Sequence, residues 1–333
     1  MTLSRLTVKP RKATTSTSKE RILPITIVGA GLAGLLAANM LRRHNPVVLE
    51  AQPSLPHNHS AVLRFRSSAV GDALGIEFKR VTMVRDVVST GNLVRDAHLY
   101  SEKAGGIIRT DRSIVRGREV AERWIAPPDL IPRMAQGVDI RYSQEWRPEE
   151  GSPRVISTIP MPVMADLIGY PRPLAFSGRV GYNLVATVSK CESYCSLLVP
   201  DPEHEFSRVS ITGDELIVEM ARGEEPSLGE AMEAVGQACL LLGIPPRRAS
   251  GISVRRQEYA KIVPIEERER QLFMHHLNGV RGIAYSLGRF ACWRPGLLAD
   301  DLVADVRTIE RWIRAGDASG FDQDLRLAAK TRG

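Results

Sequence analysis

The residues best placed for chemistry in this sequence are three glycines and a glutamate. Gly29, Gly31 and Gly34 follow an apolar stretch, residues 25–28, with the spacing GxGxxG, and Glu50 ends a second apolar stretch, PVVLE. In a strand–turn–helix–strand unit, the first glycine permits a tight turn, the second lets the backbone approach a pyrophosphate, and the third lets helix and strand pack closely. The helix N-terminus then faces the phosphates, and the acid binds ribose hydroxyls. The pattern predicts a bound dinucleotide.

The elements that must position these residues are of two kinds. Strand-then-helix patterns like the first one recur in residues 154–169 and 283–315. Between them, from about residue 180, alternating apolar and polar residues predict antiparallel strands around one helix, SLGEAMEAVGQACLLLG, in which Ser227 and Glu230 form a capping box. Residues 97–111 also alternate, and we expect exposed strands there with a turn at Gly105 and Gly106.

This order predicts an α/β fold: a Rossmann-type dinucleotide-binding domain with an inserted substrate domain of mixed or antiparallel sheet. The dinucleotide-binding domain would be discontinuous, comprising residues 22–70, 126–172 and 280–320. The substrate domain would comprise residues 71–125 and 173–279.

Most of the net charge of +7 comes from the first 21 residues, which hold six basic residues and one acidic residue. This segment is rich in Ser and Thr and poor in large apolar residues, so we expect a disordered basic tail. It is consistent with a nucleic-acid-binding arm, a transit segment or a solvated leader. The charge therefore gives little information about partners of the folded part.

The remaining composition excludes several classes. No apolar run approaches the length of a membrane span, so we expect a soluble, cytoplasmic protein without membrane contact. Cys191 and Cys195 form a CxxxC pair, and Cys239 and Cys292 stand apart, which favours reduced thiols over a zinc site. The histidines show no metal-ligand spacing, and we expect no metal.

Two further motifs accompany the glycine loop. RVISTIPMPVM places Thr158 at the end of a buried strand, and SLGRFACWRPGLLADD contains Gly288, Arg289 and Trp293, with Asp300 or Asp301 at the start of a helix. In this order the three segments resemble FAD enzymes of the large group that contains amine oxidases, protoporphyrinogen oxidase and UDP-galactopyranose mutase. The resemblance implies FAD as cofactor. The cofactor contacts that it implies are Gly29, Ala30, Gly31, Leu32, Ala33, Gly34, Glu50, Ala51, Arg64, Val138, Thr158, Gly288, Arg289 and Asp301.

The chain departs from that group in two places. The usual Gly-Gly pair after the ribose-binding acid is replaced by HNHSAVLRFRSS, in which Arg64 and Arg66 share one face of a strand. These arginines would neutralise a pyrophosphate or hold an anionic substrate, or would simply be surface residues. The Pro295-Gly296 spacing also differs from the mutase motif, so the mutase's sugar-nucleotide contacts do not transfer.

The compact chain and the segments LRFRSS, FKRV and SLGRFACWRP also resemble bacteriophage flavoproteins, some of which belong to thymidine-hypermodification pathways. In that family, a flavin oxidises an amino acid attached through its nitrogen to a thymine methyl group, and hydrolysis of the imine leaves an aminomethyl base. This resemblance implies lyase-like DNA modification in a host cytoplasm. It would also give the basic tail and the arginines a DNA backbone to bind.

The catalytic candidates are Lys261, Trp293, Arg66 and His59. Lys261 is the first candidate for a polar contact near the flavin N5, because several amine-oxidising flavoenzymes place a lysine there; the alternative is a solvated strand lysine. Trp293 would stack on the flavin or a base, or lie in the core. Arg66 would hold a substrate carboxylate or phosphate, and His59 would assist proton transfer from a polar loop.

Together these patterns predict an FAD-dependent oxidoreductase that oxidises a C–N bond of an amine, of an amino acid or of amino-acid-modified thymidine in DNA. Hydride would pass to the flavin, followed by imine hydrolysis. A redox-neutral isomerase like UDP-galactopyranose mutase, and a non-catalytic nucleotide-binding module, are the alternatives.

Overall fold

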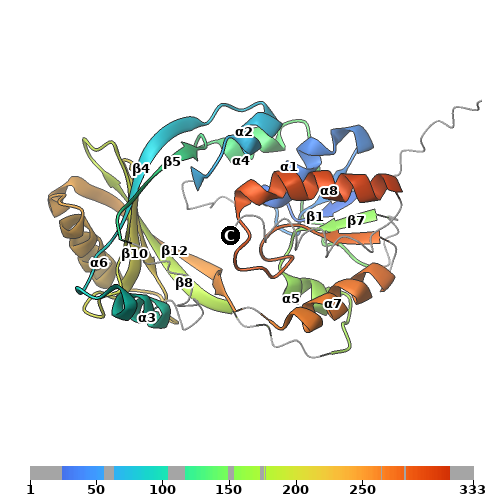
Figure 1. Ribbon diagram of the computed structural model, residues 1–333. Helices are drawn as coiled ribbons and strands as arrows, with labels where there is room; N and C mark the ends of the chain where they lie inside the picture. Colours follow the sequence, from blue (N-terminus) through green and yellow to red (C-terminus); the bar gives the residue numbers. More distant parts are fainter. Residues whose placement is uncertain are drawn as a thin grey trace, which may run out of the picture.

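The computed structural model describes residues 25–55, 64–103, 117–148, 154–172, 176, 178–263, 265–280 and 283–315. The basic tail and His59 lie outside these residues. The chain forms two sheets (Figure 1), one parallel and flanked by helices, the other larger and strongly curved. Two pairs of long strands, β4 with β5 and β8 with β12, extend from the larger sheet toward the parallel one. The prediction of a Rossmann-like domain joined to a separate mixed sheet is confirmed.

The parallel sheet has five short strands. Their order across the sheet is β13 (Ile283–Ser286), β7 (Arg154–Ser157), β1 (Thr26–Val28), β2 (Val47–Leu49) and β6 (Asp139–Arg141). All four pairings are parallel, so the carboxyl ends of the strands lie along one edge. In open α/β sheets this edge is where ligands bind.

Helices cover both faces of the parallel sheet. Figure 1 shows α1 (Leu32–Met40) and α8 (Leu302–Ala315) on one face, and α5 (Met161–Leu167) and α7 (Glu267–Val280) on the other. The short helices α2 (Ala69–Leu74) and α4 (Leu130–Ala135) pack against α1. A single apolar core joins these helices to the sheet, and strand β1 and the middle of helix α1 are buried in it.

The second sheet has eight strands. Their order is β12 (Ala249–Ile262), β8 (Gly178–Val188), β11 (Glu215–Met220), β10 (Phe206–Gly213), β9 (Ser193–Leu198), β4 (Lys79–Val87), β5 (Glu119–Ile125) and β3 (Arg64–Phe65). The pairings are antiparallel except for that of β4 with β9. The hairpin of β10 and β11 turns at Gly213, which has a positive φ of 68°.

Helix α6 (Leu228–Leu241) covers one face of the curved sheet and encloses a second apolar core with β8, β10 and β11. Its predicted capping box is present, because the Ser227 hydroxyl accepts from the Glu230 N–H and the Glu230 carboxylate accepts from the Ser227 N–H. The other face of these strands carries polar side chains. Since residues alternate across a strand, the apolar contacts to α6 leave Arg208 and Glu219 on that other face.

Three segments differ from the sequence expectation. Residues expected to form an exposed strand near residue 97 instead form helix α3 (Leu93–Lys103), whose Asp96 is fully buried and bonded to Ser89 and Thr90. Helix α7 packs on β13 and shares the core of the dinucleotide domain, although we had assigned it to the substrate domain. Strand β3, assigned to the dinucleotide domain, pairs with β5 of the curved sheet.

The short 3-10 helices η1 (Arg42–His44), η2 (Pro246–Arg248) and η3 (Ala299–Asp301) complete the described elements. Among the residues that the structure describes, no helix combines the length and apolarity needed to cross a bilayer. The four cysteines are free thiols.

Candidate cofactor and substrate site

The glycine loop joins β1 to α1 in a conformation that depends on its glycines. Gly29 has φ of +99°, and a Cβ there would lie 2.7 Å from Thr158 Oγ1. A Cβ at Gly34 would lie 1.9 Å from the carbonyl oxygen of Gly29, so any side chain would push α1 away from β1. A Cβ at Gly31 would meet no atom within 4 Å. That position at the N-terminus of α1 is therefore accessible to a phosphate group.

Glu50 follows β2 and stands beside this loop. Its Oε2 accepts a 2.7 Å hydrogen bond from the Ala30 N–H, and its Oε1 accepts one of 3.0 Å from the Gln52 N–H. Two backbone donors thus fix a carboxylate at the carboxyl end of the parallel sheet, and Ala51 next to it is exposed. A carboxylate oriented in this way has lone pairs left to accept ribose hydroxyls.

Two further turns close on the same edge. Thr158 follows β7 and donates its hydroxyl to the Val28 carbonyl at 2.8 Å, which fixes it against the glycine loop. Gly288 follows β13 with φ of +98°, and a Cβ there would lie 3.2 Å from the Cβ of Ala33 in the first turn of α1. Arg289 comes next, and its Nε is buried without a hydrogen-bond partner in the described part of the chain.

The structure therefore brings together most of the residues implied as cofactor contacts. They lie along the carboxyl edge of β1, β2, β7 and β13, and they are Gly29, Ala30, Gly31, Leu32, Ala33, Gly34, Glu50, Ala51, Thr158, Gly288 and Arg289. A loop with a positive φ, an accessible helix N-terminus and an oriented carboxylate fit a dinucleotide by shape and by donor chemistry.

Val138 does not lie with this group. It precedes β6, which runs parallel to β2 with Asp139 opposite Val47 and Arg141 opposite Leu49. Val138 is thus at the amino edge of the sheet, and this part of the expectation is corrected. The end of β6 near Glu50 is the opposite one, where the Gln144 N–H donates to the Glu50 carbonyl at 3.0 Å.

The two acids at the start of α8 have different roles. The Asp301 carboxylate accepts from the Leu298 N–H at 2.9 Å and caps η3. The Asp300 carboxylate instead accepts from the backbone N–H groups of Arg66 and Ser67, each at 2.9 Å, and so joins the dinucleotide domain to strand β3. Asp300, rather than the expected Asp301, contacts the space between the domains.

Trp293 lies in the core. Its side chain is 2% exposed, its Nε1 donates to the Val263 carbonyl at 2.8 Å, and its ring packs edge-on against Phe176 and Tyr259. It has a φ of 48°, so the turn after Gly288 holds it in a strained conformation. These contacts give Trp293 a structural role next to the carboxyl edge of the parallel sheet.

Lys261 points to a buried carboxylate and not to solvent. Its Nζ is 4.0 Å from Glu219 Oε2, and both side chains are only about one-fifth exposed. Burial lowers the pKa of Lys261, and the nearby Arg208 and Arg289 lower it further against the opposing attraction of Glu219. A lysine in such a setting can release and accept a proton more readily than a solvated one.

Glu219 is the central anion of this polar face. It forms an ion pair with Arg208 on the neighbouring strand β10. Burial disfavours its charged form, but the attraction of Arg208 and Lys261 outweighs burial and lowers its pKa. Burial also lowers the pKa of Arg289, and repulsion by Arg208 contributes.

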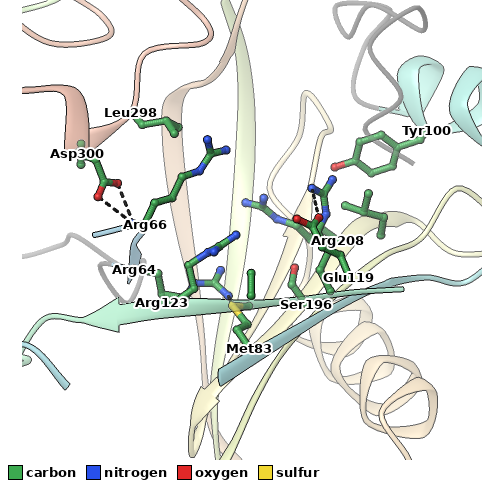
Figure 2. Close-up of a pocket in the computed structure, with 14 residues that line it drawn as sticks. Arg64, Arg66, Met83, Tyr100, Glu119, Arg123, Ser196, Arg208, Leu298 and Asp300 are labelled. Atoms are coloured by element: carbon green, nitrogen blue, oxygen red, sulfur yellow. Dashed lines mark hydrogen bonds and ion pairs between the residues drawn. The ribbon is translucent and has the colours of Figure 1, made fainter. Parts of the chain in front are cut away.

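A cavity of about 290 Å³ opens between the polar face and the loop before α8. Figure 2 shows Arg64 of β3 and Arg66, which follows that strand, extending into this space, with Asp300 on one side and Arg208 and Glu119 on the other. Both candidate arginines thus line a pocket at the junction of the two domains, which is a common place for ligand sites.

Glu219, Arg208 and Arg123 were missed by the sequence reasoning. They stand in strands β10, β11 and β5, where the sequence alone does not show which polar side chains face another part of the protein. The available signal was confined to β10 and β11, whose alternate apolar residues face α6 and leave Arg208 and Glu219 together on the other face.

No family model and no curated protein matches the chain. Solved structures do resemble it. Reduced UDP-galactopyranose mutase superimposes with a TM-score of 0.63 at 12% identity, over 92% of this chain and 99% of the other. A putative FAD-containing monooxygenase from Photorhabdus luminescens gives 0.51 at 11% identity, over 92% and 94% of the two chains.

Aklavinone-11 hydroxylase, in a complex with FAD and aklavinone, gives a TM-score of 0.51 at 14% identity, over 88% of this chain and 62% of the other. At such identities the likeness concerns the backbone arrangement. The chain therefore has the fold that these proteins share, a Rossmann-like domain joined to a curved mixed sheet.

Proposed function

We propose that the chain is an FAD-dependent oxidoreductase. The observation that carries the proposal is the cofactor edge: the glycine loop, the oriented Glu50 carboxylate, and the turns at Thr158 and Gly288 converge at one edge of the parallel sheet. Two solved structures of the same fold are described as FAD proteins, which favours FAD over a nicotinamide dinucleotide.

FAD, when bound, supplies an acceptor for a hydride from the substrate carbon. The chain's own residues bind and orient the reactants. Glu50 and the first turn of α1 hold the nucleotide half, while the polar face of the curved sheet and the loop before α8 enclose the substrate side. Lys261 lies on that face, 4.0 Å from Glu219, and its neutral form would accept the proton that the substrate nitrogen releases.

For the substrate we propose a C–N bond of an amine or amino-acid adduct. Loss of hydride from carbon and of a proton from nitrogen leaves a C=N bond, and water then adds to that carbon and breaks the C–N bond. With an amino-acid-modified thymidine, the products are an oxoacid and an aminomethyl base. The thymidine assignment rests on the sequence resemblance to phage flavoproteins.

Anaerobic mixing of the purified, FAD-loaded protein with candidate substrates tests the function. We expect free amino acids or glycine-modified thymidine DNA to bleach the flavin absorption without added reductant, and air to restore it with formation of peroxide. Bleaching by dithionite alone, followed by substrate isomerisation, would replace the proposal with redox-neutral, mutase-like chemistry. Lys261→Met should slow the bleaching step by about 100-fold or more if the proton transfer is as proposed.

A further inference from the structure

The cavity between the two domains is lined by an unusual number of arginines. They are Arg64, Arg66, Arg85, Arg123 and Arg208. The strand register explains why they converge: Arg64 pairs with Ile125 and Phe65 with Trp124, so Arg66, the next residue, lies opposite Arg123. Arg85 lies opposite Glu119 and beside Ser196, which in turn is adjacent to β10. Because side chains alternate across a strand, this register places the five arginines on one face.

Only part of this positive charge is neutralised by the protein. Arg208 pairs with Glu219, and Arg85 has Glu119 at 3.8 Å. The Asp300 carboxylate is occupied by backbone N–H groups and the Ser67 hydroxyl. With Lys261, which also faces Glu219, six basic side chains face three carboxylates, so positive charge is in excess.

Arg64, Arg66 and Arg123 have no carboxylate partner among the described residues. Arg64 donates to neutral groups, the Ser210 hydroxyl at 3.3 Å and the Met83 sulfur at 3.6 Å. Arg123 donates to the neighbouring backbone carbonyl of Glu122 at 2.7 Å. Burial lowers the pKa of Arg64 to about 10, and repulsion by Arg208 and Arg123 contributes. A cation held in this way is stabilised when an anion binds beside it.

We propose that this pocket binds a phosphate group of the substrate, with Arg64, Arg66 and Arg123 as its donors. Guanidinium groups bind phosphate through paired N–H donors, and three of them match the several oxygens of a phosphate better than the two of a carboxylate. The excess of positive charge also suits a phosphate dianion. This inference deepens the proposed function. It rests on that function only where it assigns the cavity to the substrate.

The phosphate could belong to a small metabolite or to DNA, and the test separates the two. The FAD-loaded protein is titrated calorimetrically with pyrophosphate, with thymidine 5′-monophosphate, with a short single-stranded oligonucleotide and with succinate. Loading with FAD keeps these anions away from the glycine loop. We expect phosphates to bind and succinate not to bind. Binding of the mononucleotide indicates a small substrate, and binding of the oligonucleotide alone indicates DNA.

Arg66→Gln and Arg123→Gln should each weaken phosphate binding by about tenfold to about a hundredfold, and Arg66→Lys should restore part of it. The matched control is Arg133→Gln, which removes the same charge from an exposed ion pair on α4, away from the cavity. Equal binding by all variants, or binding of succinate as tight as that of pyrophosphate, would overturn the inference.

The flavin spectrum of the same samples reports separately on the proposed function. Protein without FAD would refute that function but not the pocket, because the contrast between the Arg66 and Arg133 variants can still be measured.

Discussion

Replacing Glu219 with glutamine would test how much one carboxylate on the polar face contributes to the free energy of unfolding. The change keeps the size of the side chain and removes the one charge, among the residues that the structure describes, that pairs with both Arg208 and Lys261. A unit charge pair at 4.0 Å, the separation of Lys261 from Glu219, is worth about 4 kcal/mol before desolvation at the effective dielectric of partly buried sites. Breaking a buried pair typically costs about 3–5 kcal/mol. Because the Arg208 side chain is 35% exposed, we expect the low end, about 3 kcal/mol.

Urea unfolding followed by circular dichroism measures this loss. The control is Glu122→Gln, which breaks a cross-strand pair with Arg80 of the same atom types but with side chains 63% and 51% exposed. We expect that control to lose about 1 kcal/mol or less. Equal losses in the two variants would refute the reasoning, because burial would then make no difference.

The pH dependence of the free energy of unfolding tests whether Glu219 stabilises the fold as an anion. Since the folded protein lowers the pKa of Glu219, its contribution is complete above the unfolded value of 4.5 and is lost as the pH falls through the folded value. The difference between wild type and Glu219→Gln should therefore be constant near neutral pH and shrink below pH 4.5. A difference that grows on acidification would contradict the assignment of Glu219 as an anion.

Two further substitutions test local packing. Gly34→Ala places a methyl group 1.9 Å from the carbonyl oxygen of Gly29, so unfolding in urea should show a loss of about 1–3 kcal/mol and the purified protein should lose FAD. The control, Gly31→Ala, has room for the methyl group and should keep the stability of the wild type. A Gly34→Ala protein as stable as the wild type would contradict the close packing of α1 on β1. Ser227→Ala removes the cap of α6 and should cost about 1 kcal/mol in thermal unfolding, whereas Ser227→Thr should cost less. An unchanged melting temperature in Ser227→Ala would show that the cap adds nothing.

The dinucleotide unit could be predicted because its chemistry is local. The three glycines, the helix between two strands and Glu50 lie within a short stretch, and each glycine meets a steric demand set by its neighbours. The capping box of Ser227 and Glu230 is equally local. Thr158 and Gly288 are far from the glycine loop in sequence, and parallel pairing of distant strands brings them to the same edge. They could therefore be found only through their resemblance to known motifs.

The substrate face could not be predicted in the same way. Arg123, Arg208 and Glu219 come together only through the register of eight strands, and a polar residue in an alternating strand looks the same whether it meets water or another domain. Helix α3 was missed for a related reason. In this helix the polar Asp96 is buried, where it accepts hydrogen bonds from Ser89 and Thr90, and the apolar Val94 is exposed. This arrangement is the reverse of the usual amphipathic pattern, so the helical period is obscured.

The visible absorption spectrum of the purified protein, with mass analysis of the released cofactor, tests the central claim most directly. The account predicts a flavin spectrum, release of FAD on denaturation, and loss of that spectrum in Gly34→Ala. Release of a nicotinamide dinucleotide, or the absence of any bound nucleotide after reconstitution with FAD, would contradict it.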